Sequence, residues 1–213
     1  LEHVLGDPVA FPDFDLSLVD AFRQETELFL TSTLNEDASV LNLLNADYTF
    51  VNERLARHYG IPGIYGSRFR RVTLPNTKQR GGVLGHGGVL ALTSYPTRTS
   101  PVLRGKWLLD TIFGAPPPSP PPNVPALPEG SAAGITGSVR ERLERHRKNP
   151  TCASCHAAID PLGFSLENFD ALGAWRAADV GGQPIDATGT TLGGVKLEGL
   201  SGLRALLLDR PEA

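Results

Sequence analysis

The sequence is poor in sulfur and contains no long apolar run. None of its 213 residues is methionine, and only two are cysteine. No stretch approaches the roughly 18 consecutive apolar residues of a transmembrane helix, so the sequence itself holds no membrane span. Basic residues form no block, and the formal net charge is −3. This charge distribution argues against a nucleic-acid-binding surface.

Glycine and proline are frequent but do not dominate the composition. The 23 glycines and 18 prolines stay below the roughly 25–30% that is typical of disordered chains. With 40% hydrophobic residues, the chain is long enough for one or two domains with a real core. It begins at Leu1 and shows no signal segment, so we expect it to be a piece of a longer polypeptide.

Apolar periodicity predicts a mainly α fold. From Asp13 to Leu34 the apolar residues repeat at helical spacing, and Asp15 or Ser17 can cap this helix. The expected elements are helices over 13–34, 49–59, 101–113, 138–147, 164–175 and 200–208, a short strand over 67–74, and a small β-hairpin over 181–199.

Local signals mark the ends of several of these helices. Gly60 breaks the second helix, Pro101 lies in the first turn of the third, and Gly114 follows its end. Ser138 and Glu141 can form a capping box that starts the fourth helix.

A proline-rich stretch divides the chain. Eight of the eighteen prolines fall between Ala115 and Pro128, a composition that favours an extended, semi-rigid spacer over a ligand for a proline-binding module. We therefore expect a helical domain over 1–114, the spacer over 115–130, a small segment with both cysteines over 131–180, and the start of a truncated C-terminal domain over 181–213.

Both cysteines lie in one cluster, Cys152-Ala-Ser-Cys155-His156. The pattern C-x-x-C-H is the attachment signature of c-type haem. Two thiols three positions apart can form thioethers to the two haem vinyl groups, and the histidine that follows can place its imidazole on the iron. The cluster therefore predicts one covalent haem c, bonded to Cys152 and Cys155 and ligated by His156.

Three other interpretations compete for these cysteines. A thioredoxin-like redox pair requires a βαβ unit, which the preceding sequence does not show. A zinc site usually needs four ligands, so histidines or carboxylates would have to complete it. A disulfide between Cys152 and Cys155 would close a very short loop and stabilise the fold little.

The surroundings of the cluster add a family resemblance. Three blocks carry it: HRKNPTCASCH at 146–156 with DPLGFSLENFD at 160–170, YTFVNERLARHYG at 48–60, and 80–107, which ends in TRTSPVLRGKW. Together they resemble the planctomycete-type cytochrome c proteins. The resemblance implies a helical domain ahead of a cytochrome-c-like haem segment, within a large exported bacterial protein. It supplies no reaction and no substrate.

The second axial ligand of such a haem cannot be methionine within this sequence. His86 is one candidate, because its glycine neighbours would let a porphyrin approach the backbone closely; ordinary helix packing is the alternative. His146 is a second candidate, close to Cys152 along the chain, although Val139 and Leu143 on the same helical face favour an ordinary part-buried residue.

Other residues are expected near the haem with weaker support. The carbonyl of Asp160 or Pro161 can accept the Nδ1–H of His156 and fix its ring, unless these two residues simply start a turn. Arg98, Arg104 and Trp107 are candidate donors to the haem propionates, with a surface role as the alternative for each.

The sequence thus favours an electron-transfer haem module of a larger exported protein, periplasmic or at the cell surface, that works with a redox partner protein or with neighbouring domains of its own chain. One alternative is a haem enzyme with an open distal site, or the haem subunit of an oxidoreductase. The other is a non-haem cell-surface binding or scaffold module with a Cys152–Cys155 disulfide.

Overall fold

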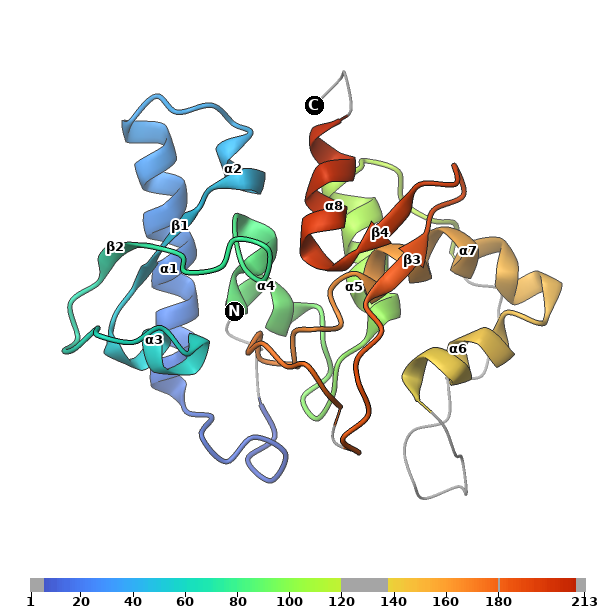
Figure 1. Ribbon diagram of the computed structural model, residues 1–213, viewed down its shortest axis with the longest axis horizontal. Coiled ribbons are helices and arrows are strands. Elements are labelled where there is room, and N and C mark those ends of the chain that lie inside the picture. Colours follow the sequence, from blue (N-terminus) through green and yellow to red (C-terminus); the bar gives the residue numbers. More distant parts are fainter. Residues whose placement is uncertain (1–5, 120–137, 180, 210–213) are drawn as a thin grey trace.

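The computed structural model describes residues 6–119, 138–179 and 181–209, and in this part of the chain helices dominate (Figure 1). Two small antiparallel hairpins accompany them, which confirms the expected mainly α fold with a short β-hairpin. The elements are α1 (Leu16–Asn35), α2 (Asn42–Asn45), β1 (Tyr48–Val51), α3 (Glu53–Tyr59), β2 (Arg70–Thr73), η1 (Val83–Gly85), α4 (Gly87–Leu92), α5 (Pro101–Trp107), η2 (Leu108–Ile112), α6 (Val139–His146), α7 (Pro150–Phe164), β3 (Thr188–Thr190), β4 (Lys196–Glu198) and α8 (Gly199–Leu208).

The N-terminal part packs α1 against the β1–β2 hairpin and α3. Asp15 caps α1 as expected, because its Oδ1 accepts the Leu18 N–H at 2.9 Å. The prediction of a helix over 49–59 is wrong for its first residues, because the chain up to Val51 pairs with β2. Asn52 then caps α3, which ends at Gly60 in the left-handed conformation. The ladder with β2 and the burial of Tyr48, Thr49 and Val51 override the helical pattern there.

Helices α5 and α7 pack closely against each other at two glycines, Gly105 and Gly163. A Cβ on Gly163 would lie 2.8 Å from Pro101 Cα, and one on Gly105 would lie 2.8 Å from the carbonyl carbon of Ile159. Both distances are too short for a real side chain, so only glycine lets the two backbones meet. Pro101 opens α5 and Gly114 follows η2, as the sequence predicts, but the last turn is a π-helix.

The segment after α7 corrects another expectation. Residues 165–175 form turns instead of a helix, and Phe169 pairs with Trp175 in an isolated β-bridge. The cause is the Asp170 side chain, which accepts the backbone N–H groups of Leu172 and Ala174 at 2.9 and 2.8 Å. An aspartate that bonds its own backbone in this way competes with the helix.

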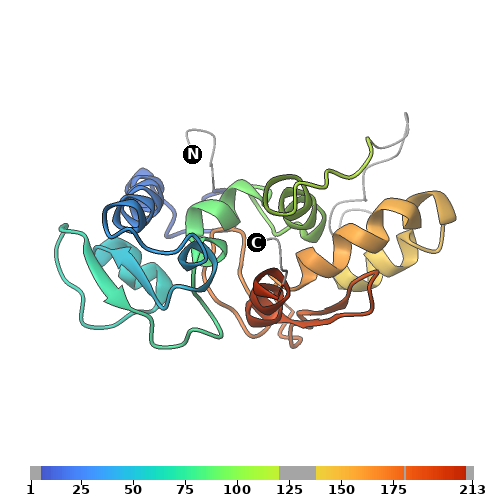
Figure 2. The same cartoon turned by 90° about the horizontal axis from the view of Figure 1, so that it is seen from above.

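Seen from above, the β1–β2 hairpin with α1 and α3 lies at one end of the molecule and α6 with α7 at the other (Figure 2). One core cluster between them joins Leu84, Leu90 and Leu108 with residues of α7 and α8. Packing therefore connects the two sides of the proline-rich spacer. Residues 120–130 of this spacer lie outside the described chain. None of the described helices has both the length and the apolarity needed to cross a bilayer.

Candidate functional site

The cysteine cluster lies on the outer half of α7. The sequence predicts that Pro150 ends the preceding helix, but α6 already ends at His146. Pro150 instead occupies the first turn of α7, where its missing N–H costs nothing. Cys152, Cys155 and His156 follow in the next two turns, and spacings of three and four residues place them on one helical face. Both thiols are unpaired and half-buried.

A buried carboxylate holds the imidazole of this cluster. Nδ1 of His156 lies 2.8 Å from Oδ1 of Asp160, one helical turn further along α7, and Asp160 is fully buried. The other carboxylate oxygen, Oδ2 of Asp160, lies 3.5 Å from Nε of Arg147 and forms an ion pair without a hydrogen bond. When Nδ1 donates its proton to the carboxylate, Nε2 presents its lone pair to a metal, the arrangement found behind many metal-binding histidines.

His146 is the imidazole next to His156 in the described structure. It ends α6, which packs on α7, and the two rings meet edge to face with their centroids 4.8 Å apart. Burial lowers the pKa of His146, and the neighbouring His156 lowers it further. The Ser138–Glu141 capping box predicted from the sequence starts α6 and thereby positions this histidine.

His86 lies elsewhere in the fold. It precedes α4 and is 2% exposed, with Nδ1 3.1 Å from Thr26 Oγ1 and its ring edge-on to Phe29 of α1. Burial lowers its pKa, and its Nε2 has no hydrogen-bond partner among the described residues. Both views place α4 away from the outer half of α7, so the fold does not bring His86 and His156 together (Figures 1 and 2).

Arg104 is the best-satisfied of the predicted propionate partners, but its partners are protein groups. Its fully buried guanidinium donates to the carbonyl oxygens of Leu166, Phe169 and Asp170 at 2.7–2.9 Å. It also lies 3.4 Å from Glu167 Oε1. Burial lowers its pKa to about 10, so it stays charged at neutral pH. This geometry favours a structural role, as the anchor of the turns after α7.

The remaining predicted neighbours lie in the segment before α5, in α5 and in α7. The Arg98 guanidinium stacks on the Tyr95 ring at 4.3 Å, and Trp107 is half-buried against the core cluster. Pro161 lies inside α7, so Asp160 and Pro161 do not start a turn. It is the side chain of Asp160, and not a backbone carbonyl, that accepts from His156. The i,i+4 spacing of histidine and aspartate on one helix is the sequence signal that identifies this partner.

The described residues at the cluster fit a c-type haem. Two thiols that form no disulfide share one partly exposed helical face with an imidazole, and Nδ1 of this imidazole already contacts a carboxylate. In the described chain, no group of three or more His, Cys, Asp or Glu side chains is arranged to hold a metal ion. Haem iron needs one histidine on its proximal side, and His156 can supply it.

Comparisons with known proteins agree with the resemblance at the level of domain families. Residues 80–179 match the family PSCyt3, a protein of unknown function (DUF1588), and residues 1–61 match PSD4, a protein of unknown function (DUF1592). No curated protein and no solved structure matches the chain. The chain is therefore similar to two planctomycete cytochrome-type domains of unknown function, with the PSD4-like segment preceding the PSCyt3-like segment.

Proposed function

We propose that the chain carries one covalently attached haem c at Cys152 and Cys155, with His156 as the proximal iron ligand, and that it transfers electrons within a larger exported bacterial protein. The observation that carries this proposal is the contact between His156 Nδ1 and Asp160 Oδ1 at 2.8 Å, on the same helix face as two free thiols. A redox pair or a disulfide has no use for a carboxylate that orients this imidazole.

The described residues around the cluster each have a defined task in this proposal. The thiols hold the group, His156 Nε2 binds the iron, and the buried Asp160 fixes the ring and makes it a stronger donor. The haem itself supplies one-electron chemistry between its ferrous and ferric states. The partner is a redox protein or a neighbouring domain of the same chain, and the compartment is the periplasm or the cell surface.

The experiment is expression with a cytochrome c maturation system, followed by intact-mass measurement and a pyridine haemochrome spectrum. The wild type should gain the mass of one haem, and Cys155→Ser should lose most of it. Ser154→Ala is the matched control, because this exposed residue lies between the two cysteines and bonds only locally. A wild-type mass equal to that of the bare polypeptide contradicts the proposal.

The competing enzyme function depends on whether the sixth coordination position is open. His146 lies beside His156 on the described surface, so its imidazole is the nearest candidate to influence the iron. A ferric spectrum that is low-spin at neutral pH supports electron transfer. A high-spin spectrum, with ready binding of cyanide, supports the enzyme instead.

A further inference from the structure

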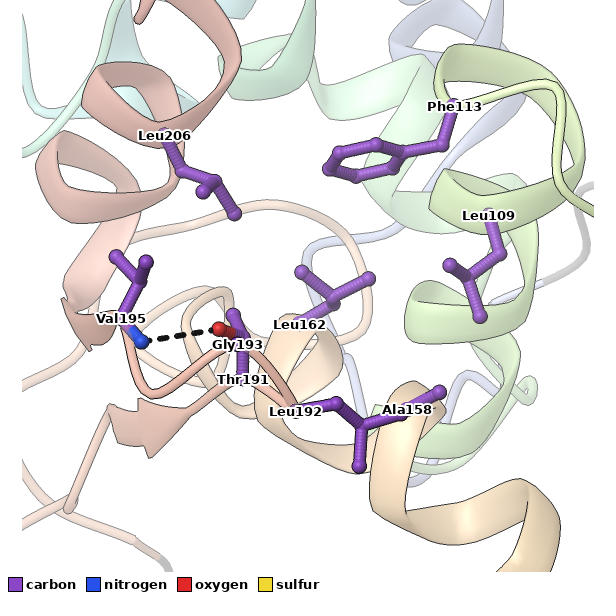
Figure 3. A pocket seen from close by; sticks show the side chains of 9 residues that line it. All are labelled: Leu109, Phe113, Ala158, Leu162, Thr191, Leu192, Gly193, Val195 and Leu206. Carbon is purple, nitrogen blue, oxygen red and sulfur yellow. Dashed lines mark hydrogen bonds between the residues drawn. The ribbon is translucent and has the colours of Figure 1, made fainter. Parts of the chain in front are cut away.

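An apolar pocket of about 280 Å³ adjoins the cysteine-bearing helix. It lies where η2, α7, the β3–β4 turn and α8 come together, and its walls include Leu109, Phe113, Ala158, Leu162, Leu192 and Leu206 (Figure 3). The lining hydroxyl, on Thr191, already accepts the Val195 N–H at 3.1 Å. The side chains of the walls are thus mostly hydrocarbon, so an occupant should present an apolar edge.

Helical spacing connects this pocket to the cluster. Cys155, Ala158 and Leu162 stand at positions i, i+3 and i+7 of α7, so they follow one another along one face. Ala158 and Leu162 form a wall of the pocket, and Cys155 lies one turn before them. A group bonded to the Cys155 sulfur therefore lies beside the opening.

Helix α5 and its continuation η2, which face α7, also lead from the glycine contacts to the pocket. Gly163 meets Pro101 and Gly105 meets Ile159, so α5 and α7 run antiparallel in steps of four residues. One further step in this register would bring Leu109 level with Cys155, and η2 does contact α7. At this step the helix widens into η2, where the Phe113 N–H bonds the carbonyl of Leu108 at 3.0 Å. The widened turn places both Leu109 and Phe113 on the pocket.

We propose that this pocket receives the apolar edge of the haem that is bonded to Cys155, an inference that rests on the proposed function. A volume of about 280 Å³ is below the ~300–1,000 Å³ of pockets that enclose a whole small molecule, so it accommodates an edge and not the full macrocycle. At its rim, Leu192 and Val195 leave 75% and 44% of their surfaces exposed. The apolar lining thus continues outward to exposed side chains at the rim, which a bound haem edge would cover.

The first test compares haem-loaded and haem-free protein by NMR with labelled leucine methyl groups. Ring-current and paramagnetic shifts should move the methyl signals of Leu109, Leu162 and Leu192 far from their haem-free positions. The methyl signals of Leu18 in α1 and Leu55 in α3, both buried in a separate core cluster, should stay in place. Unchanged signals from the pocket leucines in protein that does carry haem overturn the pocket assignment and leave the haem proposal standing.

The second test places a charge at the rim. Leu192→Asp should keep its covalent haem and lower the midpoint potential, because a nearby carboxylate stabilises the ferric state. Leu34→Asp is the matched control: Leu34 is 80% exposed, comparable to Leu192, and lies at the end of α1. Equal potentials in the two variants refute the pocket assignment. A wild-type mass without haem refutes both the proposed function and this inference.

Discussion

The crossing of α5 and α7 makes Gly163→Ala a severely destabilising substitution. The new methyl would lie 2.5 Å from the carbonyl carbon of Pro101 and 2.8 Å from its Cα, both backbone atoms that cannot rotate away. The helices would have to separate by about 1 Å, which forfeits roughly a quarter to a half of each dispersion contact across the crossing. With overpacking costs of about 1–3 kcal/mol and sometimes more, we expect a loss of about 3 kcal/mol.

The assay is thermal and urea unfolding followed by far-UV circular dichroism. For a chain of 213 residues, a loss of about 3 kcal/mol corresponds to a decrease in Tm of about 6–12 °C. Gly193→Ala is the control, because a Cβ there meets only Thr191 Oγ1, at 3.8 Å. It should stay within about 0.5 kcal/mol of the wild type. If Gly163→Ala is as stable as this control, the described crossing is incorrect.

Three further predictions follow from buried polar groups. Arg104→Lys should lower the free energy of unfolding in urea by about 3–5 kcal/mol, because an ammonium cannot reach all the carbonyl oxygens that the guanidinium bonds. An unchanged unfolding midpoint contradicts the anchoring role of Arg104. Burial lowers the pKa of His58 and of His86, so the unfolded chain binds more protons below about pH 6.5, and the free energy of unfolding should fall between pH 7.5 and pH 5.5. His86→Gln should reduce this pH dependence, and a flat profile in the wild type contradicts it. Asp160→Asn should retain the haem but raise its midpoint potential, by about 59 mV for each tenfold loss of preference for the ferric state. An unchanged potential contradicts the role given to this carboxylate.

Local signals in the sequence predict much of the helical framework correctly. Side-chain caps at Asp15 and Ser138 mark the starts of α1 and α6, and Gly114 marks the end of η2. Gly60 ends α3 in a left-handed conformation, as the break at this point predicts. These features depend on neighbours within four residues, so the sequence alone contains the information.

Features set by distant contacts are not predictable in this way. Residues 49–51 become a strand because β2, about twenty residues later, pairs with them. Turns replace the expected helix after Phe164 for two reasons. The Asp170 side chain accepts nearby backbone N–H groups, and Arg104, more than sixty residues earlier in the sequence, donates to carbonyl oxygens of these turns. At the cluster, the motif singles out Cys152, Cys155 and His156, which α7 places on one helical face. The burial that isolates His86 depends instead on tertiary packing against α1.

The most direct test of the central proposal is the mass of one tryptic peptide from protein matured with haem. Cleavage after Lys148 and Arg176 releases residues 149–176, which contain Cys152, Cys155 and His156 and no other lysine or arginine. We predict that this peptide carries the mass of one haem, held by two thioethers, and that it releases none on reduction with a thiol. An unmodified peptide with two free thiols, or with a reducible disulfide, contradicts the account.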